Sequence, residues 1–141
     1  MRKDFFDFPT TFNFEYALQS DLSNELHLEL ASNLANNPEQ IKQMSPRKFE
    51  ELICGIFKNF GFCVELTAQT HDGGRDIIAV DTFSVSKTKY LIECKHCKNI
   101  GIDFVRSLYG VVTDERATKG ILVTTANSFS KNIKNHIDRN K

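Results

Sequence analysis

Glu93 and Lys95 are separated by one residue in a short apolar stretch that is typical of a strand. Side chains two apart in a strand project from the same face, so a carboxylate and an ammonium are presented together. If the preceding hairpin pairs Asp81 with Thr88, then Asp76 lies opposite Glu93, and opposite residues of an antiparallel ladder share a face. The three groups are therefore expected to converge. A register shift of one residue would turn Asp76 to the other face.

Two carboxylates brought together repel each other, and a hard divalent cation relieves that repulsion. A site with few protein ligands and open water positions favours Mg²⁺ over Ca²⁺, and we expect Mn²⁺ to substitute for it. Such an ion can bind a scissile phosphate oxygen, lower the pKa of an attacking water and stabilise the leaving oxygen. Lys95 would orient or deprotonate the water, or stabilise the transition state, and the sequence leaves these roles open. The plain alternative is a surface ion-pair patch.

A fourth acidic residue, Glu50, is placed by a predicted helix. Ser45 is a good N-cap and Pro46 suits the first helical position. Apolar residues then recur at helical spacing until Gly61 ends the run. On this helix Glu50 falls at the edge of the apolar stripe, whereas Glu51 points away from it. Glu50 is therefore expected to complete the metal shell, directly or through water.

The other elements follow from periodicity and turn residues. We predict strands at 62–67, 76–80, 89–95 and 120–125, a helix at 102–117 and a basic helix from Ser128 onward. The helix at 102–117 is expected to turn one face inward, formed by Ile102, Val105, Leu108, Tyr109 and Val112. The resulting order, αβββαβ, indicates the α/β class with a central mixed sheet flanked by helices.

The length of 141 residues fits one domain. Residues 45–141 carry the motifs described above. Residues 1–44 are expected to belong to the same unit, as an aromatic-rich arm and an extra N-terminal helix whose leucines recur every four residues, although 25–30 would also suit a strand. The sequence shows no signal peptide and no membrane span, so we expect a cytoplasmic protein that needs no disulfides.

The zero net charge hides an asymmetry. Residues 1–86 hold 7 Lys or Arg and 13 Asp or Glu, whereas residues 87–141 hold 11 and 5, which gives charges of minus six and plus six. A basic half suggests a polyanionic partner, although the two halves can also neutralise each other within the fold. The candidate phosphate-contacting residues are Lys98, Arg106, Lys119, Lys131 and Lys134. A solvated surface would explain any one of them equally well.

Three weaker signals lie near the proposed site. Gln69 and His96 are possible accessory residues by position alone, and such a histidine is more often an ordinary loop residue. Cys94 and Cys97 have the CxxC spacing of zinc and redox sites. In a strand these two cysteines face opposite sides, which makes a metal or redox role the less favoured interpretation.

The order of the motifs resembles the Mrr-like restriction endonucleases of the wider PD-(D/E)xK nuclease superfamily. The resemblance covers roughly residues 40–133 and rests on SPRKFEEL at 45–52, Gly61-Phe62, DGGRDI at 72–77, ECK at 93–95 and GILVTT at 120–125. It implies a restriction-endonuclease-like core, magnesium-dependent cleavage and DNA as the substrate. By this similarity Asp76, Glu93 and Lys95 take the catalytic positions and Glu50 that of the helix glutamate. Many relatives have Gln where this chain has Glu93.

We therefore expect a Mg²⁺-dependent endodeoxyribonuclease that acts in restriction or defence against foreign DNA. Cutting both strands of a duplex generally needs two sites, so a homodimer is expected. A separate subunit or domain could supply target recognition. The alternatives are a catalytically inactive DNA-binding or regulatory module of the same fold, and a junction or repair nuclease.

Overall fold

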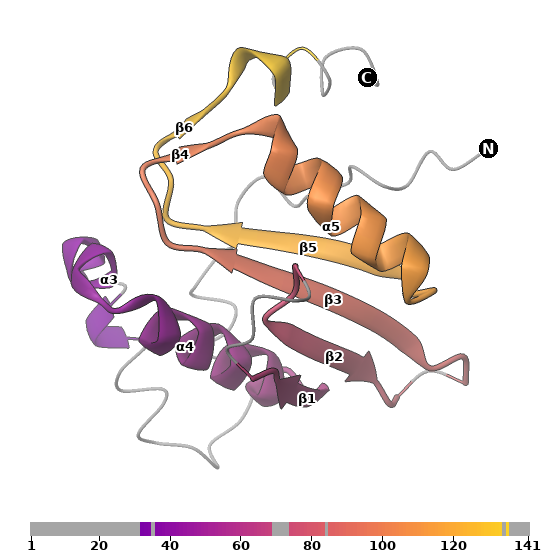
Figure 1. Cartoon of the computed structure of the whole chain (residues 1–141). Helices are drawn as coiled ribbons and strands as arrows, with labels where there is room; N and C mark the ends of the chain where they lie inside the picture. Colours follow the sequence, from indigo (N-terminus) through magenta and orange to yellow (C-terminus); the bar gives the residue numbers. More distant parts are fainter. Residues whose placement is uncertain (1–31, 35, 69–73, 84, 134, 136–141) are drawn as a thin grey trace.

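The computed structural model describes residues 32–34, 36–68, 74–83, 85–133 and 135 (Figure 1). Its centre is a four-stranded sheet in the order β1-β2-β3-β5. The strands are β1 (Cys63–Leu66), β2 (Ile77–Asp81), β3 (Thr88–Lys95) and β5 (Lys119–Thr124). The main helices are α4 (Pro46–Asn59) and α5 (Ile102–Asp114), and a short helix α3 (Pro38–Gln43) precedes them. The predicted α/β class with a central mixed sheet is confirmed.

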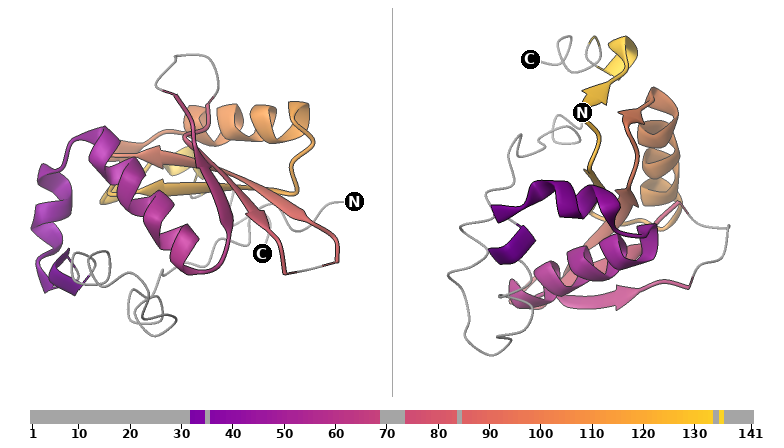
Figure 2. Two further views of the ribbon diagram at one scale, coloured as in Figure 1. Left: turned by 90° about the horizontal axis from the view of Figure 1, so that it is seen from below. Right: turned by 90° about the vertical axis from the view of Figure 1, so that its left-hand side faces the viewer.

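The sheet contains both antiparallel and parallel strand pairs, because its strands are joined by different kinds of connection. Strands β1, β2 and β3 are antiparallel neighbours, whereas β5 runs parallel to β3 after the crossover through α5. Helices α4 and α5 lie on opposite sides of the sheet (Figure 2). Ile77, Ile92 and Cys94 pack toward α4, while Leu91 packs with Leu108 of α5. Alternate residues of β3 therefore serve two different cores.

Helix α4 begins and ends where its sequence predicts. The Ser45 side chain accepts a hydrogen bond from the Lys48 amide, and Pro46 occupies the first turn, where a missing N–H costs nothing. Phe49, Leu52, Ile53 and Ile56 form its buried stripe. Beyond the helix Gly61 adopts a φ of +88°, the left-handed conformation that commonly terminates helices.

Helix α5 is shorter than predicted and is rotated from the predicted face. It ends at Asp114, because Glu115 caps it and Arg116 has a φ of +52°. Tyr109, expected to point inward, is 47% exposed, whereas Leu108 and Val112 are buried. Gly120 permits this close packing, since a Cβ there would lie 2.8 Å from Val112 Cγ2.

Strands β3 and β5 are each followed by a short strand that sequence reasoning missed. Strand β4 (Asn99–Ile100) pairs in parallel with β6 (Ser128–Phe129), and Ser128 bonds to Asn99. The predicted helix from Ser128 is therefore wrong at its start, and helical residues begin at Lys131. The pairing forms because both chain segments leave adjacent parallel strands in the same direction.

Most of the predicted N-terminal helix lies outside the described residues. Its described part, 32–34, is helical, and Leu34 is buried against the core cluster that contains Phe49. Within the described ranges, no helix combines the length and apolar character needed to cross a membrane.

Candidate active site

The β2–β3 hairpin has the predicted register, with Asp81 paired to Thr88 and Ile77 to Ile92. The Asp76 amide also donates a hydrogen bond of 2.8 Å to the Ile92 carbonyl, so the ladder continues past the end of β2. Asp76 therefore begins the strand on the face of Ile78, and the same parity puts Glu93 on the face of Leu91. Both carboxylates belong to the α5 side of the sheet.

The Asp76 carboxylate is held by the neighbouring strand. Its Oδ2 accepts a hydrogen bond of 2.6 Å from the backbone amide of Cys94. A bond from a backbone donor to an ionised acceptor is among the stronger hydrogen bonds in proteins. This bond fixes the Asp76 carboxylate beside Cys94, the residue that follows Glu93.

Glu93 is the only charged residue among the buried residues of the described part of the chain. Its Oε1 lies 2.7 Å from the Lys95 Nζ, while Oε2 is buried and has no hydrogen-bond partner in that part. Burial raises the pKa of Glu93 above its ordinary value; the ion pair with Lys95 opposes this shift and the charge of Asp76 adds to it. A buried carboxylate oxygen without a partner, beside a second carboxylate, fits a bound cation.

Lys95 is positioned by two contacts from one side of the sheet. Besides Glu93, its Nζ lies 4.9 Å from the centroid of the Phe104 ring in the first turn of α5. A cation over an aromatic face is attracted to it electrostatically. Sequence reasoning missed Phe104, because the inward face predicted for that helix, which runs from Ile102 to Val112, did not include it. Phe104 could have been identified from the expectation that Lys95 and α5 lie on the same face of the sheet.

Glu50 lies on the other side of the sheet from the Asp76 and Glu93 carboxylates. It lies on α4 with its side chain 13% exposed, and its Oε2 accepts a hydrogen bond of 3.0 Å from Arg47 Nη1. Burial raises the pKa of the Cys94 thiol, and the charges of Asp76, Glu50 and Glu93 raise it further. Among the described residues, no three acidic, His or Cys side chains are spaced to share one ion. Asp76 and Glu93, which share one face at facing strand positions, are the two carboxylates that could hold one.

The predicted basic residues are spread over the molecule. Lys98 follows β3 at the site end of the sheet, Arg106 lies on α5, and both are exposed, as is Lys131. Lys119 pairs with Tyr90 at the opposite end of the parallel strands from Lys95, so the structure does not bring it to the site. Lys134 and the accessory candidate Gln69 lie outside the described residues.

His96 has both ring nitrogens in contact with protein groups. Nδ1 lies 3.1 Å from Thr125 Oγ1, Nε2 lies 3.0 Å from the Lys42 carbonyl, and the ring packs against Phe49 with centroids 5.5 Å apart. This arrangement ties the last turn of α3 and the first turn of α4 to the ends of β3 and β5. These partners suit a structural histidine better than a proton relay.

Cys94 and Cys97 do not form a CxxC metal or redox pair in the described structure. Both are free thiols, and Cys94 is buried toward α4 while Cys97 Sγ donates to the Asn99 carbonyl at 3.2 Å. Cys97 lies beyond the end of β3 at Lys95, so the strand parity expected from sequence applies to Cys94 and not to Cys97.

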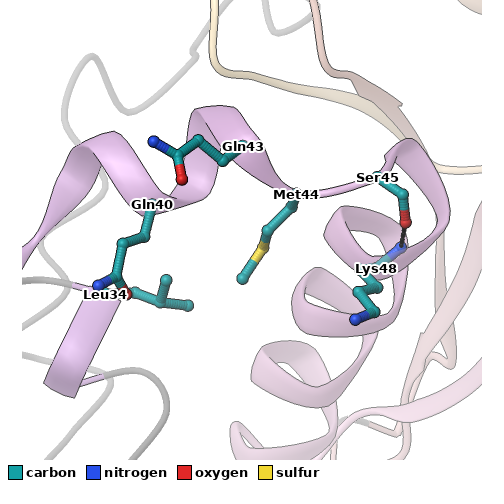
Figure 3. Close-up of a pocket in the computed structure, with 6 residues that line it drawn as sticks. All are labelled: Leu34, Gln40, Gln43, Met44, Ser45 and Lys48. Carbon is teal, nitrogen blue, oxygen red and sulfur yellow. Dashed lines mark hydrogen bonds between the residues drawn. The ribbon is translucent and has the colours of Figure 1, made fainter.

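An open pocket of about 350 Å³ lies between α3 and the start of α4 (Figure 3). Its lining residues are Leu34, Gln40, Gln43, Met44, Ser45 and Lys48. None of the candidate catalytic side chains is among them, so this hollow is separate from the carboxylate site.

Comparison with known proteins gives a consistent picture. The model of the Mrr_cat family, described as restriction endonuclease, matches residues 41–141. The uncharacterized protein y4cE of Sinorhizobium fredii (strain NBRC 101917 / NGR234) is 28% identical over 104 residues, which cover 72% of this chain and 27% of that protein. The type IV methyl-directed restriction enzyme EcoKMrr of Escherichia coli (strain K12) is 25% identical over 100 residues, 66% of this chain and 32% of that enzyme. The chain thus spans only about a third or less of these relatives, and no solved structure matches it significantly.

Proposed function

We propose, from the premise that this chain belongs to the Mrr_cat restriction endonuclease family, that it hydrolyses DNA phosphodiester bonds with a divalent metal ion held by Asp76 and Glu93. The observation that carries this proposal is the buried Glu93 Oε2, which has no hydrogen-bond partner among the described residues. Such an atom is costly unless a cation or donor satisfies it. Asp76 supplies a second oxygen ligand from the opposite strand.

Magnesium suits this site best, because two carboxylates leave most of its octahedral positions to water and substrate. When bound, the ion would neutralise charge on the phosphate and acidify the attacking water. Mn²⁺ is expected to replace it, since it accepts the same oxygen ligands.

The protein groups around the ligands have separate roles. The Cys94 amide holds the Asp76 carboxylate in place through its 2.6 Å bond. The Lys95 ammonium, held between Glu93 and Phe104, stabilises negative charge on the phosphate or orients the attacking water. Glu50 is assigned an indirect role, through water, because its helix α4 lies on the opposite side of the sheet from the carboxylate pair.

The substrate path is proposed along the site end of β3 and β5. Strands β4 and β6 continue from those ends, and segments 96–102 and 117–137 contain no Asp or Glu. Lys98, Arg106 and Lys131 would contact phosphates there, with Lys134 as a further candidate.

A homodimer would present two such sites to a duplex, and a further domain or subunit would choose the target. One relative's name, methyl-directed restriction enzyme, supports a defence role against modified DNA.

Plasmid cleavage tests the proposal. The wild type should nick or linearise DNA with Mg²⁺ or Mn²⁺ and stop when EDTA is added, while Asp76→Ala should be inactive. If the two proteins behave alike, the proposed activity is wrong. An inactive DNA-binding module would instead bind DNA in a salt-sensitive way that is unchanged by metal and by Lys95→Ala.

A further inference from the structure

Arg47 is the residue that connects Glu50 to the rest of the site. A single guanidinium nitrogen, Nη1, donates to Glu50 Oε2 and to the Thr67 carbonyl, both at 3.0 Å. The Arg47 side chain is 32% exposed, so both contacts are partly shielded from water. A second carboxylate, Glu51, lies farther from Arg47, at 3.7 Å from Nε, and is 58% exposed. Arg47 thus joins the start of α4 to the end of β1.

Thr67 continues this connection to the other catalytic carboxylate. Its amide donates to the Asp76 carbonyl at 2.9 Å. Its hydroxyl lies 3.0 Å from the same carbonyl and 3.1 Å from the carbonyl of Arg75. These bonds hold the backbone of Asp76 where the chain enters β2. The Asp76 carboxylate then bonds to the Cys94 amide, beside Glu93.

We propose that Arg47 is a positioning residue that sets Glu50 and Asp76 in register across the two sides of the sheet, acting through Thr67. The inference rests on the proposed function, because it assumes that these carboxylates serve a metal site. Arg47 does not contact the reacting atoms in this arrangement. It links the Glu50 carboxylate, through Thr67, to the backbone of Asp76, which lies 26 residues farther along the chain.

The physical reason lies in the charge of the Glu50 carboxylate. Glu50 is mostly buried, and without Arg47 its charge would have no cation beside it in the described structure. A buried carboxylate without a partner turns toward water, which displaces it from its position on α4. Arginine suits the position because its rigid fork can hold several acceptors at once, whereas lysine offers one compact charge.

The test compares Arg47→Ala and Arg47→Lys with Lys48→Ala, which removes the same charge from the next, exposed helix position. Thr67→Val removes only the hydroxyl contacts, and Thr67→Ser keeps them. Three quantities are measured: kcat and KM for plasmid cleavage, Mn²⁺ affinity by calorimetry without DNA, and the NMR shift and exchange rate of the Cys94 amide. The Cys94 amide reports the position of Asp76 whether or not the protein cuts DNA.

Loss of outer contacts to metal ligands typically lowers affinity or activity about 10- to 100-fold. We expect losses of that size in kcat and in Mn²⁺ affinity for Arg47→Ala, with KM unchanged and a shifted Cys94 amide. Arg47→Lys and Thr67→Val should fall between this variant and the wild type, while Thr67→Ser and Lys48→Ala should match the wild type.

Two results would overturn the inference. One is wild-type kcat, Mn²⁺ affinity and Cys94 shift in Arg47→Ala. The other is a raised KM with unchanged kcat, together with DNA binding that depends less strongly on salt. That result would make Arg47 a phosphate contact. If the wild type neither cuts DNA nor binds Mn²⁺, the proposed function fails instead. An unchanged NMR shift of the Cys94 amide in folded Arg47→Ala would exclude the positioning role independently of activity.

Discussion

The Asp76 carboxylate accepts a hydrogen bond of 2.6 Å from the Cys94 amide, so a side chain at the start of one strand is fixed to the backbone of the next. Because Cys94 follows Glu93, this bond holds the two carboxylates together even though their charges repel. The folded protein therefore stabilises a pair of groups that is unfavourable without a cation.

Replacing Asp76 by Asn tests the charge separately from the hydrogen bond. The amide oxygen of Asn can still accept from Cys94, whereas the negative charge is lost. We expect cleavage to fall by at least about a hundredfold, the usual cost of deleting a positioned electrostatic group, with little change in Tm. Plasmid cleavage and thermal unfolding measure the two effects. Undiminished cleavage by a folded Asp76→Asn protein would contradict the role of Asp76 as a metal ligand.

Glu93 should make the metal-free protein less stable as the pH rises. Burial raises its pKa above the ordinary value of 4.5, so between that value and the folded-state pKa the folded protein binds more protons than the unfolded chain. Its contribution to stability is therefore present at low pH and is lost as the pH rises through the folded pKa. Urea unfolding in EDTA should show this decline in the wild type and not in Glu93→Gln.

The same pair of proteins gives a metal test. Mg²⁺ or Mn²⁺ should raise the Tm of the wild type at neutral pH, because a ligand that binds only the folded state stabilises it by about 2.7 kcal/mol at a hundred times its Kd. Glu93→Gln should respond far less. Equal shifts in both proteins would place the ion elsewhere.

Phe104→Leu should disturb Lys95 without removing any charge. The ring contact at 4.9 Å is of a kind that contributes about 0.5–2 kcal/mol. We expect kcat to fall several-fold, and Phe104→Tyr to retain most activity because it keeps the aromatic face. The control is Tyr109→Leu, which also removes an aromatic ring but does so on the more exposed side of α5. Equal kcat values for Phe104→Leu and Tyr109→Leu would argue against a role for the ring.

Gly74→Ala and Gly110→Ala should change stability in opposite directions. Gly74 has a φ of +58°, and a Cβ there would lie 3.1 Å from Val111 Cγ2, so alanine should cost about 1–2 kcal/mol. Gly110 is helical and has open space around it, so alanine should stabilise by about 0.5–1 kcal/mol. Chemical denaturation measures both free energies of unfolding. A Gly74→Ala protein as stable as the wild type would contradict the strained loop before Asp76.

The four thiols should react with a disulfide reagent in an order set by burial. Cys63 is exposed and should react first, whereas Cys94 is buried, with its pKa raised by desolvation and by nearby carboxylates. Cys94 should be modified only when the protein unfolds. Mass spectrometry of the labelled peptides at successive times identifies each site, and early labelling of Cys94 would show that its strand opens in the native state.

Features that depend on neighbouring residues could be predicted from the sequence alone. Ser45, Pro46 and Gly61 specify where α4 begins and ends, because caps and backbone conformation act within a few residues. Strand parity put Glu93 and Lys95 on one face, and the loop between Asp81 and Thr88 gave the register that carries Asp76 to Glu93. Resemblance of these motifs also identified the family.

How these elements meet depends on packing across the whole fold. Periodicity shows which helical residues share a face but not which part of the helix the sheet covers, so Tyr109 was expected to point inward and Phe104 was missed. The bridge from Arg47 to Thr67 spans 20 residues, and the pairing of β4 with β6 links Asn99 to Ser128. No local pattern encodes such contacts, because they depend on the packing of both sheet faces at once.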